Sequence, residues 1–186
     1  MQWRIIPPDR FQTSLWAGGS TTQLAIFPPE ARYADRDFLW RVSSAQVELP
    51  HSVFTSLPDY DRFLSTLEGD LVLEMDGSGR RTLRPLEVCH FDGGLRVESW
   101  GTCRDFNLML RKGRCTGEMT ALHLAKGEHR LCRWEADVVG LYCCEGSVGW
   151  LQAGQFALAD RPAPLELTAQ GETTLVAVRI HYSMKN

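Results

Sequence analysis

Several large classes of protein leave marks that this chain lacks. Its 186 residues have a formal net charge of -3 and no cluster of lysine and arginine, so no basic surface for nucleic acid is expected. The longest apolar runs are only a few residues, too short to cross a bilayer. Residues 1–8 hold no long apolar stretch of the kind that directs secretion, which predicts a cytoplasmic protein without a membrane partner.

Motifs for metal, cofactor and nucleophile chemistry are also missing. The histidines, at positions 51, 90, 123, 129 and 181, include no two separated by a single residue. Closely spaced imidazole and carboxylate ligands are what iron, manganese or zinc would need. Neither a glycine-rich phosphate loop nor Gly-x-Ser-x-Gly occurs. The sequence therefore predicts no metal, no cofactor and no catalytic nucleophile.

The cysteines indicate a reduced interior. They lie at positions 89, 103, 115, 132, 143 and 144, and none forms a Cys-x-x-Cys pair. The adjacent Cys143 and Cys144 suit neither zinc nor an ordinary disulfide. Since neighbours on a strand point to opposite faces, one of this pair is expected in the core. All six are predicted to be reduced and mostly buried.

Short β-strand patterns are abundant, and one arrangement of them repeats. Residues 67–70 and 83–92 give a strand ending in Glu-Gly, a return, a turn and a short apolar strand closed by Asp92. Residues 144–147 and 151–160 have the same order, with a shorter hairpin. Such punctuation is typical of small antiparallel barrels. It predicts an all-β fold with little helix, built from two related barrels in tandem.

The join between these barrels is expected at the polar, glycine-flanked segment 113–117. It divides the chain into an N-terminal barrel at 1–113 and a C-terminal barrel at 114–186. So short a join predicts barrels packed closely together, between which strands could be exchanged. Residues 58–62 indicate a turn or a single helical turn leading into a strand at 63–67.

Polar residues inside apolar strands are the best candidates for a site. Alternation over residues 38–45 places the even positions on one face and the odd positions, with Arg41 and Ser43, on the other. Periodicity alone favours the even face as the interior and Arg41 in water. If the odd face lines the interior, Arg41 is a buried guanidinium that needs an anion or a carboxylate. Its planar fork would hold a carboxylate in a bidentate pair.

Three further segments have two open interpretations each. Arg62 follows two aspartates and is either their ion-pair partner or a ligand clamp. Asp105 and Asn107 share a strand face, and a polar pair on such a face is typical of solvent. Residues 16–23 place glycines and hydroxyls after a tryptophan, which indicates either a tight turn or a contact surface for a ligand.

Taken in order, five segments resemble the HutD/Ves family of bicupin proteins, which belongs to the RmlC-like cupin superfamily. The segments are 16–24 (WAGGSTTQL), 38–45 (FLWRVSSA), 54–58 with 60–62 (FTSLP and YDR), 67–69 (LEG) and 105–109 (DFNLM). The similarity covers residues 1–115 strongly and the remainder weakly. Five motifs in the right order are more specific than any one of them. The resemblance implies two cupin jelly-roll barrels, usually without a metal motif.

The resemblance also implies a function. Family members are associated with histidine utilisation in bacteria, as regulators or small-molecule binders, and intermediates such as urocanate and formylglutamate are carboxylates. It therefore implies a non-enzymatic binder of a small anionic metabolite, with Arg41 facing a pocket in the N-terminal barrel. The ligand-binding residues implied are Trp16, Gly19, Thr22, Arg41, Ser43, Arg62 and Asn107. Gln23 stands where the family usually has an acid, which weakens any mechanism that needs a carboxylate base there.

Two alternatives from other functional classes stay open. A metal-independent cupin enzyme, an isomerase or hydrolase of a small polar metabolite, would need a general acid or base, for which His51, His90 and Asp105 are candidates. A protein-interaction module would bind a partner, such as a transcription factor, through exposed barrel edges. Assembly into a homodimer is a further open expectation.

Overall fold

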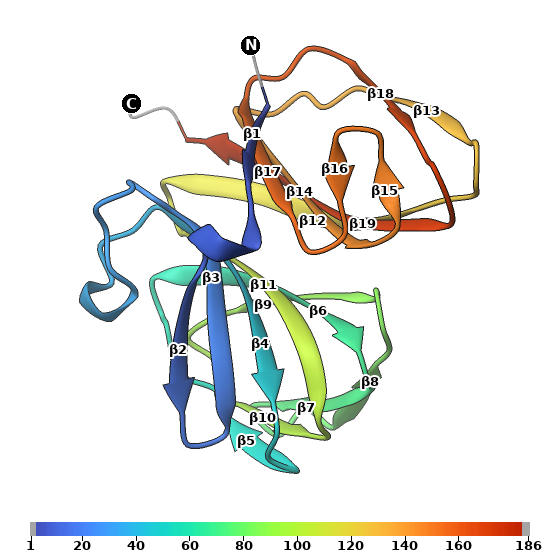
Figure 1. Ribbon diagram of the computed structural model, residues 1–186. Helices are drawn as coiled ribbons and strands as arrows, with labels where there is room; N and C mark the ends of the chain where they lie inside the picture. Colours follow the sequence, from blue (N-terminus) through green and yellow to red (C-terminus); the bar gives the residue numbers. More distant parts are fainter. Residues whose placement is uncertain (1–2, 184–186) are drawn as a thin grey trace. The chain divides into compact units, whose positions relative to one another are not determined.

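The computed structural model describes residues 3–183, and strands dominate it (Figure 1). The regular structure of these residues consists of nineteen strands and two short 3-10 helices, η1 (Pro8–Arg10) and η2 (Tyr33–Asp35). The prediction of an all-β chain with little helix is confirmed. No helix within residues 3–183 combines the length and apolar character needed to cross a membrane.

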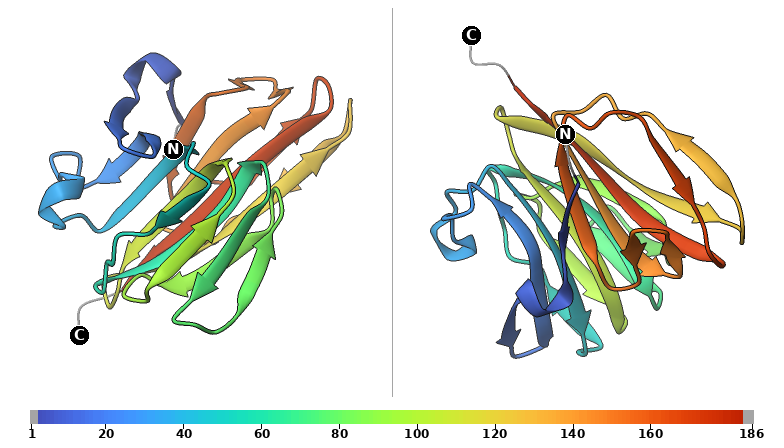
Figure 2. Two further views of the ribbon diagram at one scale, coloured as in Figure 1. Left: turned by 90° about the horizontal axis from the view of Figure 1, so that it is seen from below. Right: turned by 45° about the horizontal axis from the view of Figure 1, so that its top comes forward.

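The chain divides into two compact units. The N-terminal unit consists of residues 12–115, and the C-terminal unit combines residues 116–183 with residues 3–11. The first residues belong to the C-terminal unit because β1 (Arg4–Ile6) pairs with β17 (Phe156–Asp160). The dark-blue β1 runs beside the orange β17 in Figures 1 and 2. The sequence-based division at 113 places this strand in the N-terminal barrel. In the structure, its long-range pairing with β17 makes it part of the C-terminal unit instead.

Two antiparallel sheets build the N-terminal unit. The larger has the order β2-β3-β4-β11-β6-β9 and the smaller the order β5-β10-β7-β8. The bounds are β2 (Gln12–Trp16), β3 (Gly19–Phe27), β4 (Trp40–Val47), β5 (His51–Val53), β6 (Tyr60–Glu68), β7 (Leu71–Met75), β8 (Arg80–Leu83), β9 (Val88–Asp92), β10 (Val97–Trp100) and β11 (Cys103–Arg111). The β6 strand begins at Tyr60, whereas the sequence predicts a turn at 58–62 and a strand from 63. The second half of the expected turn is therefore already part of the strand.

The C-terminal unit has one five-stranded sheet, in the order β1-β17-β14-β19-β12, and two strand pairs, β13-β18 and β15-β16. The remaining bounds are β12 (Cys115–Leu124), β13 (His129–Cys132), β14 (Val138–Glu145), β15 (Ser147–Val148), β16 (Leu151–Gln152), β18 (Leu165–Thr168) and β19 (Thr173–Tyr182).

The sequence repeat appears as the same hairpin plan in both units. β6 ends at Glu68 and β14 at Glu145, and the next residue in each case is a glycine with positive φ, 78° at Gly69 and 74° at Gly146. A Cβ on these glycines would lie 2.6 Å and 2.3 Å from a backbone carbonyl oxygen, so only glycine fits. β6 then pairs with β9 and β11, as β14 pairs with β17 and β19.

An apolar cluster fills part of the N-terminal interior. Leu64 and Cys89 contribute to it from the larger sheet, and Leu71, Leu73 and Val97 from the smaller one. All five side chains are at most 2% exposed. Burial of such residues is the main favourable contribution to folding. The two sheets of this unit are therefore fixed against each other around a well-packed core.

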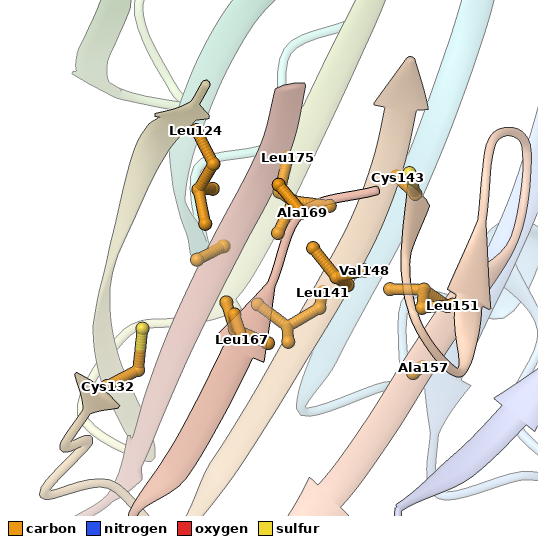
Figure 3. Packing of buried hydrophobic residues seen from close by; sticks show 11 residues of the cluster. Leu124, Cys132, Leu141, Cys143, Val148, Leu151, Ala157, Leu167, Ala169 and Leu175 are labelled. Atoms are coloured by element: carbon orange, nitrogen blue, oxygen red, sulfur yellow. The ribbon is translucent and has the colours of Figure 1, made fainter. Parts of the chain in front are cut away.

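The C-terminal interior is apolar along its length. Its buried cluster, drawn in Figure 3, consists of Leu124, Cys132, Leu141, Cys143, Val148, Leu151, Ala157, Leu167, Ala169, Leu175 and Ala177. Three tryptophans pack against this cluster, and the ring of Trp3 lies 5.8 Å from that of Trp134 and 5.4 Å from that of Trp150. The N-terminal strand thus brings an aromatic anchor to the C-terminal core.

The cysteines behave as the sequence predicts. None of the six forms a disulfide within residues 3–183; Cys144 is half-buried and the other five are buried. Cys143 is fully buried, which confirms that one member of the adjacent pair belongs to the core. Burial raises the pKa of the Cys143 thiol to about 11 and that of Cys103 to about 12. Both are therefore protonated thiols at neutral pH.

Candidate ligand pocket

A cavity of about 360 Å³ opens in the N-terminal unit. Strands β2, β3, β4, β6 and β11 supply one part of its lining, and Tyr33 with residues 52–55 supplies the rest. Its size lies in the range of small-molecule sites. Unlike the apolar cluster of the same unit, the cavity has three charged side chains in its lining: Arg41, Arg62 and Asp105.

Strand alternation explains how these polar groups meet. On β4 the odd positions, with Arg41 and Ser43, line the cavity, while on β11 Asp105, Asn107 and Met109 do so. Met109 is the register partner of Arg41 on one side and of Arg62 on the other. The two arginines therefore extend from the same row of the sheet, with one strand between them. At the usual strand spacing, their Cα atoms are about 10 Å apart.

Arg41 is 5% exposed and is held in place by neutral groups. Its Nε donates to Oε1 of Gln23 at 2.8 Å, and one terminal nitrogen donates to Oγ of Ser43 at 3.1 Å. The guanidinium also lies over the ring of Tyr33, 4.4 Å from the centroid. Burial lowers the pKa of Arg41 to about 10, so it remains charged at neutral pH.

Arg62 has a different environment. Its side chain is 6% exposed, and its guanidinium lies beside two aromatic rings, 5.0 Å from the Phe54 centroid and 5.3 Å from that of Phe91. Within residues 3–183 its Nε has no hydrogen-bond partner. Burial lowers the pKa of Arg62. Neither aspartate that precedes Arg62 in the chain forms an ion pair with it, so the interpretation as a local ion-pair partner is wrong.

Asp105 is the one carboxylate in the lining. Its Oδ1 accepts a hydrogen bond from the backbone N–H of Ala45 at 2.9 Å. Burial raises the pKa of Asp105 to about 6, although the Ala45 N–H, Arg62 and Arg41 oppose the shift. The side chains of Asp105 and Asn107 are each 6% exposed, so the expectation of a solvated face is wrong here. Alternation says which residues share a face; it does not say which face water reaches.

Asn107 adds an acceptor without a partner. Its Oδ1 is buried and receives no hydrogen bond from the residues that the structure describes. Its register partner is Leu64, two positions from Arg62, which makes Asn107 and Arg62 diagonal neighbours about 7 Å apart. Buried polar groups are almost always satisfied by protein, water or ligand. The cavity therefore presents a cation and an acceptor that its own walls leave open.

Trp16 lies at the rim of the cavity. It is 41% exposed, and a Cβ on Gly18 would lie 2.1 Å from its ring and 2.9 Å from the side chain of Leu49. The absence of a side chain at Gly18 thus lets the indole fold back over the turn. Elsewhere in the lining, the ring of Tyr33 contacts two guanidinium groups. That of Arg36 lies 3.8 Å from the ring centroid and that of Arg41 lies 4.4 Å from it.

The structure brings five of the seven predicted ligand-binding residues into this lining: Trp16, Arg41, Ser43, Arg62 and Asn107. Thr22 lies outside it, because its hydroxyl meets that of Thr13 at 2.9 Å, and its neighbour Thr21 lines the cavity instead. Gly19 lies outside it as well. A Cβ at this glycine (φ +145°) would be 1.9 Å from the carbonyl oxygen of Gln46, so its role is to let two strands approach.

Tyr33, Thr21 and Gln23 were missed by the sequence-based reasoning. Tyr33 comes from the short η2 segment, which no strand pattern links to the cavity. Gln23 departs from the residue usual in the family, and its contact with Arg41 depends on a register shift between Gln23 and Ala25 in the β3–β4 pair. Such a bulge redirects side chains, and it has no clear signal in the sequence.

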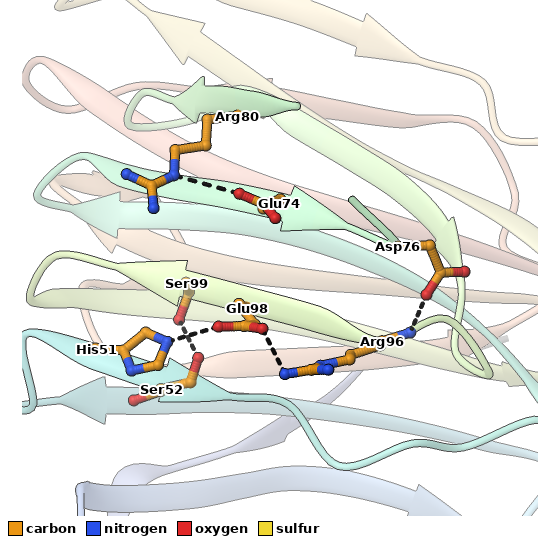
Figure 4. Close-up of polar contacts among 8 residues, drawn as sticks. All are labelled: His51, Ser52, Glu74, Asp76, Arg80, Arg96, Glu98 and Ser99. Carbon is orange, nitrogen blue, oxygen red and sulfur yellow. Dashed lines mark hydrogen bonds and ion pairs between the residues drawn. The ribbon is translucent and has the colours of Figure 1, made fainter. Parts of the chain in front are cut away.

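The histidines proposed as acid or base lie elsewhere. His51 meets Glu98 at 2.9 Å and stacks on Trp100, on the outer side of the smaller sheet, where Figure 4 shows it among other charge pairs. His90 stacks on Phe63, with the ring centroids 4.2 Å apart. Neither lines the cavity. In the part of the chain that the structure describes, no three His, Cys, Asp or Glu side chains are grouped as metal ligands would be.

Two units with the same β-hairpin plan, each built of antiparallel sheets around its own core, define a bicupin. One of its barrels contains a cavity with charged side chains in its lining. The family model of HutD matches residues 9–177, most of the chain, and the protein belongs to the HutD family.

Individual relatives agree with this assignment. Protein Ves from Cronobacter sakazakii (strain ATCC BAA-894) is 31% identical over 117 residues, which is 59% of this chain and 61% of that relative. A conserved protein of unknown function from Pseudomonas aeruginosa PAO1 superposes with a TM-score of 0.81 at 24% identity, covering 97% of this chain and 100% of the other. HutD from Pseudomonas fluorescens SBW25, in a formate condition, gives 0.75 at 22%, with 97% and 99% covered.

Proposed function

We propose that the N-terminal unit binds a small carboxylate metabolite without transforming it, and that binding serves a regulatory role in cytoplasmic histidine utilisation. The observation behind this proposal is Arg62, a guanidinium 6% exposed whose Nε has no hydrogen-bond partner among the described residues. Urocanate and formylglutamate are the ligands suggested by the family, and both molecules are small enough to fit in a cavity of this volume.

Energetics supports an anion as the missing partner. A buried unpaired guanidinium destabilises the folded protein, and removal from water costs several kcal/mol per ion even after relaxation, in round terms. Opposite charge and charge-assisted hydrogen bonds offset that cost. Asp105 offsets part of the charge of Arg62, but within residues 3–183 it does not form an ion pair or a hydrogen bond with either arginine. A ligand carboxylate held by Arg62 and the remaining donors of Arg41 would provide both the negative charge and the hydrogen bonds.

The P. fluorescens relative lends modest support, because its structure belongs to a formate condition and formate is the smallest carboxylate. Within the proposal, formate corresponds to the carboxylate group of a larger metabolite. The remainder of that metabolite would lie against Trp16 and Tyr33, whose rings offer flat apolar surfaces.

A second candidate is a metal-independent enzyme, and one observation favours it. Asp105 lies in the cavity with its pKa raised to about 6, close to the value that a general base near neutral pH requires. No histidine lines the cavity to serve as its complement. The two functions differ in outcome: after prolonged incubation a binder returns its ligand unchanged, whereas an enzyme yields a product visible by NMR.

Calorimetry with urocanate, N-formylglutamate and formate tests the proposal. At least one is expected to bind with a 1:1 stoichiometry and to raise the melting temperature. Linkage gives about 2.7 kcal/mol of added stability at a ligand concentration of 100 Kd. Arg62→Met should weaken binding about a hundredfold, while Arg80→Met, on the smaller sheet, should leave it intact. Absence of heat and of any melting shift with all three acids would contradict the proposal.

A further inference from the structure

The hydrogen-bond partners of Arg41 are neutral. Gln23 accepts from its Nε through an amide oxygen, and Ser43 accepts from a terminal nitrogen through a hydroxyl. Gln23 does not line the cavity itself. It is half-buried on β3 and holds the guanidinium of Arg41 through this hydrogen bond. A carboxylate at this position would reach the same Nε with the same side-chain length, but with opposite charge.

The charges of the cavity then leave a positive surplus. Arg41 and Arg62 contribute +2 and an ionised Asp105 contributes -1, which leaves +1. Among the described residues, no ion pair joins Asp105 to either arginine, and its Oδ1 accepts a hydrogen bond from the Ala45 N–H. Arg36, stacked on Tyr33, adds a further positive charge close by. The surplus exists because the anchor of Arg41 is an amide.

We propose that Gln23 is a positioning residue that sets the charge selectivity of the pocket. By holding Arg41 without neutralising it, Gln23 makes the site prefer a carboxylate over the corresponding neutral amide. This inference rests on the proposed function, since it concerns the same pocket. A glutamate at position 23 would cancel the +1 surplus through an ion pair with Arg41 and remove that preference.

The test compares wild type, Gln23→Glu, Gln23→Met and the control Gln46→Glu. Gln46 lies on the same sheet at an even position of β4, exposed and on the face opposite Arg41, so it adds the same charge away from the pocket. The probes are urocanate with its primary amide, and N-formylglutamate with N-formylglutamine. Calorimetry gives the ratio of amide Kd to acid Kd for each variant.

Gln23→Glu is expected to weaken binding of the acids about tenfold or more and to lower the amide-to-acid ratio by a similar factor. Gln23→Met should weaken acid and amide alike, because it loses the anchor but keeps the charge. Gln46→Glu should match wild type. An unchanged ratio in Gln23→Glu, or the same fall in Gln46→Glu, would overturn the inference.

A readout that needs no ligand separates this inference from the proposed function. Asp105 faces Arg41 on β4 and Arg62 on β6, and Tyr33 and Arg36 lie beyond them. A negative charge at position 23 makes ionisation of Asp105 harder, so carbon NMR of its carboxyl should show a higher pKa in Gln23→Glu. If that pKa rises while no probe binds any variant, the proposed function fails and the electrostatic role of Gln23 stands. If probes bind and the pKa is unchanged, the inference fails.

Discussion

The two barrels share a backbone plan and differ in what fills them. In the N-terminal unit Asp61 on β6 pairs with Asp92, and in the C-terminal unit Val138 on β14 pairs with Asp160. Asp61 and Val138 are therefore equivalent positions, and the rest of β6 and β14 can be aligned from them. On this alignment, and on the pairing of β11 and β19, three polar residues of the N-terminal unit correspond to apolar ones in the C-terminal unit: Arg62 to Val139, Asn107 to Ala177 and Asp105 to Leu175.

The substitutions convert a cavity into a core. Val139, Ala177 and Leu175 are at most 1% exposed, and the last two belong to the packed cluster of Figure 3. Leucine and valine at these positions leave no polar group to satisfy, whereas their counterparts leave a donor and an acceptor open. The same architecture therefore encloses a cavity with charged lining in one barrel and a well-packed apolar cluster in the other.

The largest expected effect comes from placing the charge in the wrong barrel. Val139→Arg puts a guanidinium where Val139 is fully buried and opposite Arg179 on β19. Without a cavity or a partner, it should lower the free energy of unfolding by about 4 kcal/mol or more. Urea denaturation measures this change, with Val139→Ile as the control. If Val139→Arg were as stable as wild type, the contrast between the interiors would be lost.

Removing the Arg62 charge from the N-terminal barrel should lower ligand affinity without lowering the free energy of unfolding. Arg62→Met replaces a buried guanidinium with an apolar chain beside Phe54 and Phe91. We expect about a hundredfold loss of carboxylate affinity, since a buried charge contact typically contributes 2–5 kcal/mol in rough terms. Stability should be unchanged or higher by about 1–4 kcal/mol. Calorimetry and urea denaturation on the same samples decide; a clear loss of stability would mark Arg62 as structural.

The buried Asp105 predicts a particular pH dependence. Its pKa is about 6 in the folded protein and about 3.9 when unfolded, so the folded state binds more protons between these values and stability falls as pH rises from 4 to 6. Ionised Asp105 thus costs about 2–3 kcal/mol above pH 6. Asp105→Asn keeps an acceptor for the Ala45 N–H and removes the titration.

The stability of Asp105→Asn relative to wild type should therefore increase across pH 4–6 and level off above it. Urea denaturation at several pH values measures the difference, in which the titrations common to both proteins cancel. A flat difference across this range would mean that Asp105 ionises normally.

The smallest effect distinguishes two adjacent threonines. Thr21→Val removes a hydroxyl from the cavity lining and should weaken carboxylate binding by about 0.5–1.5 kcal/mol. Thr22→Val removes the contact with Thr13 on the other face and should leave affinity unchanged. Calorimetry with the tightest-binding acid of the panel compares them, and the reverse order would show that β3 presents its other face to the ligand.

The sequence predicts the architecture well because strand periodicity and the Glu-Gly hairpins are local signals. It predicts the polar lining poorly because burial is not local. β4 and β11 are buried on both faces, so Val42 and Leu108 are as inaccessible as Arg41 and Asn107, and alternation alone cannot choose between them. The family resemblance implies a pocket position for Arg41, and Arg41 lines the cavity. Two features depend on strand registers that no short motif encodes: the position of Thr21 in the cavity lining where Thr22 was expected, and the pairing of β1 with β17.

The central claim, one ligand site in the N-terminal interior and none in the C-terminal one, is tested most directly by an NMR titration of isotopically labelled protein with urocanate and N-formylglutamate. The account predicts the largest shift changes at the Asn107 side-chain amide and the Arg62 Nε–H, both saturating with the calorimetric Kd, while Val139, Leu175 and Ala177 stay unperturbed. Saturating changes at these three C-terminal positions, or none at Asn107 and Arg62, would contradict it.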